Sequence, residues 1–255
     1  MLYVSQSNNV TVLEMQDVAK RNTLTGPMIA ALRGALRDLP IDTRAVVLRA
    51  APACTVWSAG FDIGSLGPGV DPLAPVSPLM ALFHAVRDCR VPVIASIHGS
   101  CWGGGTDLAL RCDLLVADPT CTLAFTPARI GLAYDTDGLH HVLHRAGLAL
   151  AMEMFVTGEP VSAARAAQHG LINHLVEPEA LVAVTAALAQ KIAAMAPLSV
   201  QVAKQQLRAL AAAIPLAPAV QDAIDAARAR VLASDDYRDG VAAFLARRPV
   251  VFKGQ

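Results

Sequence analysis

The sequence predicts an α/β fold in its first half, followed by a helical region. Short apolar runs that are typical of strands alternate with amphipathic helical stretches up to residue 117. From Gly138 onward strand-like runs nearly vanish, and alanine-rich segments that favour helices follow one another. The chain has 255 residues, of which 54% are hydrophobic, and this is enough to fill a sizeable core. A soluble globular enzyme is therefore the expected class.

The individual elements follow from these patterns. Strands are expected at residues 10–13, 45–48, 93–97 and 114–117, with helices between them at 28–39 and 79–88. Later helices are expected at 147–156, 162–168, 178–195, 198–213, 218–233 and 236–246. Residues 64–72 are rich in glycine and proline, and this composition predicts a mobile flap over the bound substrate.

The balance of charge argues against two classes of partner. The chain has 21 basic and 21 acidic residues, so no overall positive field attracts nucleic acid or an anionic membrane. The amino end shows no basic segment followed by an apolar one, which a secretory signal requires. The apolar stretch 209–220 is too short to span a bilayer and is interrupted by Pro215 and Pro218. A cytoplasmic protein without nucleic-acid or membrane partners is expected.

Several chemical motifs are excluded. The five cysteines include no Cys-x-x-Cys pair and leave one over in any disulfide scheme, so reduced, buried thiols are expected, Cys101 among them. His140 and His144 have the spacing of metal ligands on a helix, but no glutamate or third ligand accompanies them, and no metal is expected. The glycine-rich turns lack dinucleotide and P-loop spacing, and Ser100 lacks the spacing of a hydrolase nucleophile.

Two glycine-rich turns, at residues 57–63 and 99–107, predict an oxyanion hole. Their glycines let the backbone approach a ligand closely, and small neighbours leave N–H groups unobstructed. The second turn leads into a helical stretch, so its free amides are expected at a helix N-terminus, where negative charge is favoured. The three consecutive glycines from Gly103 to Gly105 weaken a helix start, which indicates that a close approach requires them. The turns therefore predict a site for a developing anion.

The segments Ser58-Ala59-Gly60-Phe61-Asp62-Ile63 and Gly103-Gly104-Gly105-Thr106-Asp107 resemble the crotonase (enoyl-CoA hydratase/isomerase) superfamily, and the resemblance covers nearly the whole chain. It implies a crotonase/ClpP-like spiral of ββα repeats with a helical C-terminal subdomain. A core with the CoA-thioester site is implied at residues 1–195, and a trimerisation or lid region at 196–255. The resemblance also implies an acyl-CoA substrate, no cofactor beyond the coenzyme A of that substrate, and a homotrimer or a dimer of trimers.

The same resemblance implies roles for individual residues. The N–H groups of Phe61 and Gly104 would hold the thioester oxygen, on which an enolate places its charge. Contacts with the CoA moiety are implied for Lys20, Arg21, Asn22, Ala59, Asp62, Ile63, Gly103, Phe244 and Lys253. For Lys20, Arg21 and Lys253 a solvated surface position is the alternative.

The reaction depends on which other groups reach the thioester. Hydratases of the superfamily use two glutamates; here the first position is Asp107 and the second is Pro127, which cannot exchange a proton. An efficient hydratase is therefore disfavoured. An isomerase that uses Asp107 alone stays open, and so does a role for Asp107 as a plain helix-start residue.

A closer resemblance is to the methylmalonyl-CoA decarboxylase subfamily, through Asp71-Pro72-Leu73, Thr126-Pro127 and Tyr134 among others. In that subfamily the tyrosine that matches Tyr134 lies near the departing carboxylate, which implies loss of carbon dioxide from a malonyl-type thioester. A half-buried loop tyrosine is the alternative. The subfamily has histidine where this chain has Phe61, so the backbone N–H is retained and an imidazole is lost. A non-catalytic acyl-CoA-binding protein is the second class of function that these residues allow.

Overall fold

The structure, a computed structural model, describes residues 1–65, 72–74, 76–127 and 134–212, and beyond these residues 219, 222, 223, 226, 235, 251 and 253–255. The expected flap at 64–72 and the expected helices at 218–233 and 236–246 lie largely outside the described residues, and Phe244 lies outside them. The described residues include every other residue that the sequence places at the site.

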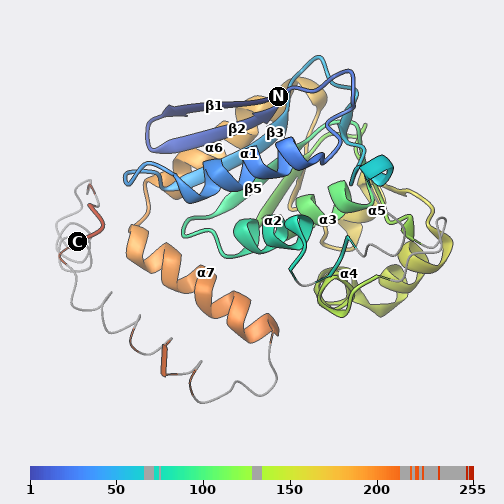
Figure 1. The fold of residues 1–255 in the computed structure, drawn as a ribbon. Coiled ribbons are helices and arrows are strands. Elements are labelled where there is room, and N and C mark those ends of the chain that lie inside the picture. Colours follow the sequence, from blue (N-terminus) through green and yellow to red (C-terminus); the bar gives the residue numbers. More distant parts are fainter. Residues whose placement is uncertain are drawn as a thin grey trace.

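Two β-sheets form the framework (Figure 1). The larger sheet has the order β1-β2-β3-β5-β7-β10, with β1 antiparallel to β2 and the later pairs parallel. Its strands are β1 (Leu2–Ser7), β2 (Val10–Met15), β3 (Ala45–Ala50), β5 (Val93–Ile97), β7 (Leu114–Ala117) and β10 (His174–Leu175). The smaller sheet, in the order β4-β6-β8-β9, consists of β4 (Val56–Ser58), β6 (Ser100–Trp102), β8 (Thr122–Ala124) and β9 (Val161–Ser162).

Seven α-helices lie in the described part of the chain: α1 (Gly26–Arg37), α2 (Pro78–Arg87), α3 (Gly104–Arg111), α4 (Thr136–Thr157), α5 (Ala163–Gln168), α6 (Leu181–Ala193) and α7 (Pro197–Ala212). Two 3-10 turns, η1 (Ile63–Ser65) and η3 (Pro178–Ala180), accompany them. The starts of α1 and α2 follow from their caps. The side-chain oxygens of Thr25 and Ser77 accept hydrogen bonds from the backbone N–H groups of Met28 and Met80, at 3.4 and 3.1 Å.

The central strands of the larger sheet, β3, β5 and β7, are buried on both faces, and this explains why they are almost continuously apolar. On β3, Val46 and Leu48 belong to the core shared with α1, α2 and α3, whereas the alternate residues Ala45 and Val47 pack toward α6. Figure 1 shows α1 and α6 on opposite sides of this sheet. Parallel strands that are covered on both faces read as apolar runs rather than as alternating patterns.

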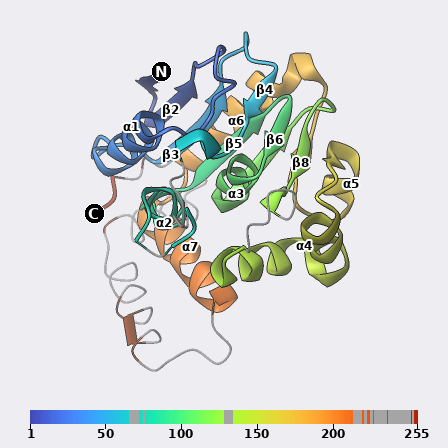
Figure 2. The same ribbon diagram turned by 45° about the vertical axis from the view of Figure 1, so that its right-hand side comes forward.

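One unit is repeated three times along the chain: a strand of the larger sheet, a strand of the smaller sheet and a helix. The three repeats are β3-β4-α2, β5-β6-α3 and β7-β8-α4. Figure 2 shows β4, β6 and β8 side by side, as their parallel pairing requires. The α/β class and the spiral of ββα repeats are thereby confirmed. Because β4 and β6 are paired, the glycine-rich turns that follow them are brought together.

The sequence pattern does not predict β1 or five shorter strands, and it places one helix start too late. Strand β1 lies at the edge of the larger sheet, is mostly exposed and has few apolar residues. Strands β4, β6, β8, β9 and β10 have two or three residues each, which is too short to show an alternating pattern. Helix α4 begins at Thr136 instead of residue 147, because the Asp135 side chain caps it by accepting a 2.9 Å hydrogen bond from Gly138 N. The expected start coincides with Gly147, where φ is 73° and ψ is 161°, so the helix is kinked there.

Helix α6 ends at Ala193 and α7 begins at Pro197. The domain boundary predicted between residues 195 and 196 falls in the connection between these helices. The division of the chain into two domains stays a prediction. Charged contacts attach α7 to the core: Lys204 Nζ and Arg208 Nη2 donate to the carboxylate of Asp113 at 2.8 and 2.9 Å.

Among the described helices, none is by itself long and apolar enough to cross a membrane. The pair Pro178–Ala193 and Pro197–Ala211, bent by 106°, meets the length and composition requirement when taken together.

Candidate active site

The two glycine-rich turns lie against each other. Gly60 has a φ of 87°, and a Cβ built on it would lie 2.4 Å from the carbonyl oxygen of Trp102. A Cβ on Gly104 would lie 3.4 Å from the nitrogen of Phe61. Only glycine allows the first of these approaches. The closeness of the Phe61 and Gly104 amides therefore depends on Gly60.

The glycine triplet is explained by close approach, as the sequence predicts. Gly103 caps α3 with a φ of 48°, and its N–H donates to the Ala124 carbonyl at 2.8 Å. A Cβ on Gly105 would lie 2.8 Å from the Cβ of Ser58. Gly103 therefore supplies the left-handed turn, whereas Gly105 lets the first turn of α3 pack on β4.

Residues 20–24 brace the first turn from outside. The Asn22 side chain is buried, and its Nδ2 donates to the Trp57 carbonyl at 3.1 Å. Ser58 Oγ donates to the Asn22 carbonyl at 2.8 Å, and the Leu24 N–H donates to the Gly60 carbonyl at 2.7 Å. Asn22 thus holds the turn in place, whereas its neighbours Lys20 and Arg21 are exposed.

A cavity of about 90 Å³ lies in front of the two turns. It is lined by Ala59, Gly60, Phe61, Ile63, Pro72, Leu73, Leu79, Gly103, Gly104, Thr126, Pro127 and Tyr134. Within the described residues, neither the Phe61 N–H nor the Gly104 N–H donates a hydrogen bond, and Gly104 is the first residue of α3. Two free donors beside a helix N-terminus can hold an oxyanion. Of the residues implied to contact CoA, Ala59, Ile63 and Gly103 line this cavity, and Lys20, Arg21, Asn22, Asp62 and Lys253 do not.

Tyr134 connects the cavity to a buried chain of polar contacts. Its hydroxyl donates a 2.6 Å hydrogen bond to Asp107 Oδ2. Arg111 Nε donates to the other carboxylate oxygen, Asp107 Oδ1, at 2.9 Å, and Arg111 Nη1 donates to Asp137 Oδ2 at 2.6 Å. Asp107 has no exposed surface and does not line the cavity. Protein groups therefore engage both oxygens of Asp107, and Tyr134 stands between this carboxylate and the cavity.

Packing and burial fix the state of Tyr134. Its ring lies against those of Phe125 and Phe155, with centroid distances of 5.4 and 5.0 Å. Burial, followed by the negative charge of Asp107, raises the pKa of the Tyr134 hydroxyl well above its ordinary value. Tyr134 therefore keeps its proton at neutral pH, and that proton lies on the Asp107 side.

Comparison with known proteins agrees with this geometry. The family described as enoyl-CoA hydratase/isomerase matches residues 5–255. The chain belongs to this family. It is 35% identical over 249 residues to methylmalonyl-CoA decarboxylase of Escherichia coli (strain K12), with 97% of this chain and 95% of that protein covered. It is 28% identical over 262 residues to 2,3-dehydroadipyl-CoA hydratase of the same organism, with 100% and 99% covered.

The fold of this family member has close counterparts among solved structures. One is described as methylmalonyl-CoA decarboxylase in complex with 2-nitronate-propionyl-CoA. It matches with a TM-score of 0.81 and 35% identity, and the match covers 100% of this chain and 98% of that chain. The protein is therefore a crotonase-superfamily acyl-CoA enzyme.

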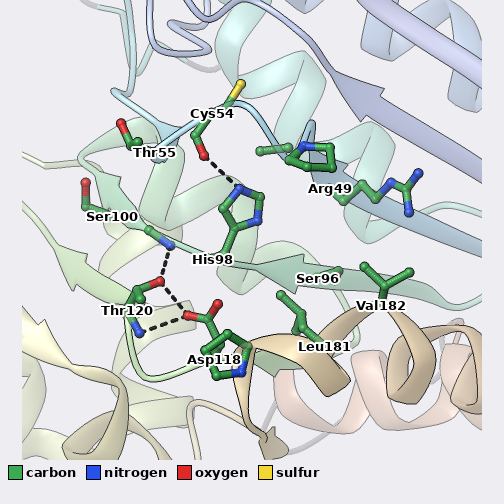
Figure 3. A pocket seen from close by; sticks show the side chains of 14 residues that line it. Arg49, Cys54, Thr55, Ser96, His98, Ser100, Asp118, Thr120, Leu181 and Val182 are labelled. Atoms are coloured by element: carbon green, nitrogen blue, oxygen red, sulfur yellow. Dashed lines mark hydrogen bonds between the residues drawn. The ribbon is translucent and has the colours of Figure 1, made fainter.

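A second, larger cavity of about 580 Å³ lies at the carboxyl ends of β3, β5 and β7 (Figure 3). Hydrogen-bond contacts hold the residues of its wall in place. His98 Nε2 lies 2.8 Å from the Cys54 carbonyl oxygen, and the Thr120 N–H donates to Asp118 Oδ1 at 2.8 Å. Its described lining includes none of Phe61, Gly104 and Tyr134. The smaller cavity is therefore the candidate active site of this enzyme.

No sequence motif marks Arg111 and Asp137 as residues of the site. Arg111 follows Asp107 by four residues, the spacing of an ion pair along a helix, so a signal was present. Most such pairs lie on the surface, whereas the Arg111 side chain here is 1% exposed. Asp137 is brought to Arg111 by the packing of α4, which no local pattern indicates.

Proposed function

We propose that this protein is a lyase that decarboxylates methylmalonyl-CoA or a related malonyl-type CoA thioester. The composition of the cavity carries the proposal. Phe61 and Gly104 line it, and their N–H groups donate to no acceptor among the described residues. None of the described residues that line it has a carboxylate, imidazole or amine side chain. Decarboxylation suits such a cavity, because the electron pair of the enolate comes from the C–C bond that breaks, and no base is needed to remove a proton.

In the proposed reaction the thioester oxygen accepts hydrogen bonds from the N–H groups of Phe61 and Gly104. The bond between the α-carbon and the carboxylate breaks, and carbon dioxide leaves. The electron pair becomes the double bond of an enolate, whose charge lies on the thioester oxygen. Each preorganised donor contributes on the order of 3 kcal/mol to this step. The enolate then takes a proton from water at its α-carbon, which gives propionyl-CoA from methylmalonyl-CoA or acetyl-CoA from malonyl-CoA.

The cavity walls support the same reaction. Phe61, Leu73, Leu79 and Pro127 present apolar surface, and a carboxylate against such walls has few hydrogen-bond donors. Poor solvation of the carboxylate favours its departure as neutral carbon dioxide. Phe61, which stands where the decarboxylase subfamily has histidine, adds to this apolar surface and still supplies its backbone N–H.

Hydration, the alternative, has less support from the geometry. A hydratase needs a titratable group within hydrogen-bond reach of the water that it activates. Asp107 lies behind Tyr134 with both oxygens engaged, and Pro127 lines the cavity at the position of the second glutamate. The same shielding of Asp107 counts against an isomerase that relies on this carboxylate.

The proposal extends to CoA binding and assembly. We expect the exposed side chains of Lys20 and Arg21 to contact the phosphates or ribose of CoA, so that alanine at either position raises KM more than it lowers kcat. We also expect a cytoplasmic homotrimer or dimer of trimers, as the family resemblance implies. Sedimentation velocity distinguishes these two assemblies from a monomer.

The test is turnover of methylmalonyl-CoA, malonyl-CoA and crotonyl-CoA, followed by mass spectrometry in H2O and in D2O. We expect carbon dioxide loss from one or both malonyl-type substrates, with one deuterium at the α-carbon of the product formed in D2O. Tyr134→Phe is expected to slow this reaction. Hydration of crotonyl-CoA without any decarboxylation, abolished by Asp107→Asn, would overturn the proposal. Tight binding without turnover of any thioester would instead indicate an acyl-CoA-binding protein.

A further inference from the structure

Arg111 is the cation at the centre of a buried network between α3 and α4. It joins Asp107, at 2.9 Å, to Asp137, at 2.6 Å, and its guanidinium carbon lies 5.5 Å from the ring centre of Phe83. Asp137 is 45% exposed, and Arg87 of α2 approaches it at 3.7 Å. The network therefore runs from Tyr134, in the cavity wall, to the solvent.

Stability alone does not explain this network. A buried ion pair is weak evidence for stability, because the loss of hydration offsets the attraction between the charges. In the described part of the chain, Arg111 Nη2 and Asp135 Oδ2 are the buried side-chain polar atoms without a hydrogen-bond partner. Both lie within or next to the network. Native proteins rarely leave such atoms unsatisfied, and departures from local optimality concentrate at functional sites.

The network determines which way the Tyr134 hydroxyl points. A phenol has one proton, and that of Tyr134 lies in the 2.6 Å hydrogen bond to Asp107, because an ionised carboxylate can only accept. The lone pairs of the hydroxyl oxygen, and not its proton, then face the cavity. A protonated Asp107 would instead donate to the phenol oxygen, and the phenol proton would be free to turn toward the cavity. The charge on Asp107 thus sets the hydrogen-bonding character of Tyr134.

We propose that Arg111, braced by Asp137, is a positioning residue that keeps Asp107 ionised, so that the proton of the Tyr134 hydroxyl is held by Asp107 and is not donated to the acyl group. The substrate carboxylate then receives no hydrogen bond from Tyr134, which favours its loss as carbon dioxide. This kinetic consequence rests on the proposed function, whereas the state of Asp107 rests on the geometry alone. Tyr134 touches the acyl group, and Arg111 acts through Asp107.

The surrounding charges are consistent with this assignment. Burial lowers the pKa of the Arg111 guanidinium, but the charges and hydrogen bonds of Asp107 and Asp137 raise it by more, so Arg111 stays charged. Burial raises the pKa of Asp137, but the hydrogen bond and charge of Arg111 lower it by more. Tyr134, Asp135 and His141 on the α4 side and His84 and Arg87 on α2 face Asp107, Arg111 or Asp137. From α7, the charged Arg208 donates to the Arg111 carbonyl oxygen at 2.7 Å.

Arg111→Met provides the direct test of the state of Asp107. The variant keeps an unbranched side chain but removes the guanidinium, so Asp107 is left buried without a cationic partner, and the neutral, protonated carboxyl is expected to be favoured. The infrared difference between Arg111→Met and the double variant Arg111→Met/Asp107→Asn should show the carbonyl band of a protonated carboxyl. The difference between the wild-type protein and Asp107→Asn should lack it. This measurement needs no substrate.

Kinetics supply the second readout. In Arg111→Met the kcat for decarboxylation is expected to fall by about 100-fold, as for a misplaced contact group, with KM changed by less than about threefold. Its kcat–pH profile should gain a step that the double variant lacks. Asp137→Asn should lower kcat less. Asp88→Asn, which disrupts a pair with Arg87 on the same surface and does not touch Arg111, should leave kcat unchanged.

Each outcome decides the inference. A folded Arg111→Met protein with no protonated-carboxyl band and a pH profile parallel to that of the wild-type enzyme overturns it. If Arg111→Met does not fold, Asp137→Asn and Asp88→Asn carry the test, and equal kcat values for the two overturn it. If the wild-type protein decarboxylates no thioester, the proposed function fails, and the infrared comparison still decides the role of Arg111.

Discussion

Replacement of Gly60 by alanine is expected to disable the oxyanion hole without unfolding the protein. A Cβ at this position would lie 2.4 Å from the carbonyl oxygen of Trp102. Non-bonded contacts of a carbon atom are comfortable from about 3.5 Å. The turn that carries residue 60 and the turn that carries Trp102 must therefore separate by about 1 Å. Because Trp102 is separated from Gly104 only by Gly103, this movement displaces the Gly104 N–H relative to that of Phe61.

The size of the effect follows from two terms. A non-glycine residue at a φ of 87° costs about 1–2 kcal/mol of stability, and relief of the clash with the Trp102 carbonyl adds about 1–3 kcal/mol. A folded domain with a stability of about 5–15 kcal/mol tolerates this sum. Loss of one oxyanion donor raises the barrier by about 2.7–4 kcal/mol, which is about 100- to 1,000-fold in kcat. Gly60→Ala should therefore reduce kcat far more than it reduces stability.

The assay combines kcat and KM for methylmalonyl-CoA decarboxylation with the free energy of unfolding from urea titration. Gly34→Ala is the matched control, since Gly34 lies within α1 and a Cβ added there would meet nothing within 4 Å. It should leave kcat unchanged and stabilise the protein by about 1 kcal/mol. A folded Gly60→Ala enzyme with kcat within about threefold of the wild-type value would refute the assignment of the hole, given the 100-fold minimum expected from a lost donor.

Three further predictions concern stability and reactivity. Burial, and then the charge of Arg111, lower the pKa of His141 to about 4; because the unfolded chain binds this proton near pH 6.5, the free energy of unfolding should fall by about 3 kcal/mol from pH 6.5 to pH 4. Urea titrations at several pH values should show that the free energy of unfolding falls less steeply with decreasing pH in His141→Gln than in the wild-type protein. The exposed His169→Gln variant should behave as the wild-type protein does. A wild-type pH dependence in His141→Gln would contradict the assignment. Burial raises the pKa values of Cys112 and Cys121 to about 12, and all five thiols are buried. A disulfide reagent at about pH 8 should therefore label the cysteines only when the protein unfolds. Rapid labelling of the native protein would count against this burial. Gly147→Ala should lower the free energy of unfolding by about 1–3 kcal/mol despite open space around the position, since its φ of 73° and ψ of 161° suit only glycine; stabilisation in a urea titration would contradict this.

The sequence predicts four strands of the larger sheet, β2, β3, β5 and β7, because burial leaves runs such as Val93–Ile97 almost wholly apolar. It does not predict β1 and β10, which lie at the two edges of that sheet. It predicts the smaller sheet poorly. Val56–Ser58 and Ser100–Trp102 become strands only because the larger sheet places them next to each other, and three residues hold too little pattern to show this.

The candidate site shows the same division. The glycines at 60 and 103–105 indicate close approach by their residue type alone, and the structure confirms it at Gly60 and Gly105. The contact of Tyr134 with Asp107 joins residues 27 positions apart, and no local spacing reveals it. The sequence left open whether Asp107 touches the substrate, and the direct catalytic role predicted for it remains untested. The structure shows that its oxygens are engaged by Tyr134 and Arg111.

Because Gly60 packs against Trp102 of the next repeat, the oxyanion hole forms only when these two repeats dock during folding. The Phe61 N–H belongs to one ββα repeat and the Gly104 N–H to the next, and neither repeat contains both donors. A partly folded chain with its helices and strands formed, but with the two repeats not yet docked, would have no place for an oxyanion. Recovery of turnover during refolding should therefore trail the recovery of helical circular dichroism, which makes enzymatic rate a reporter of the docking between neighbouring repeats.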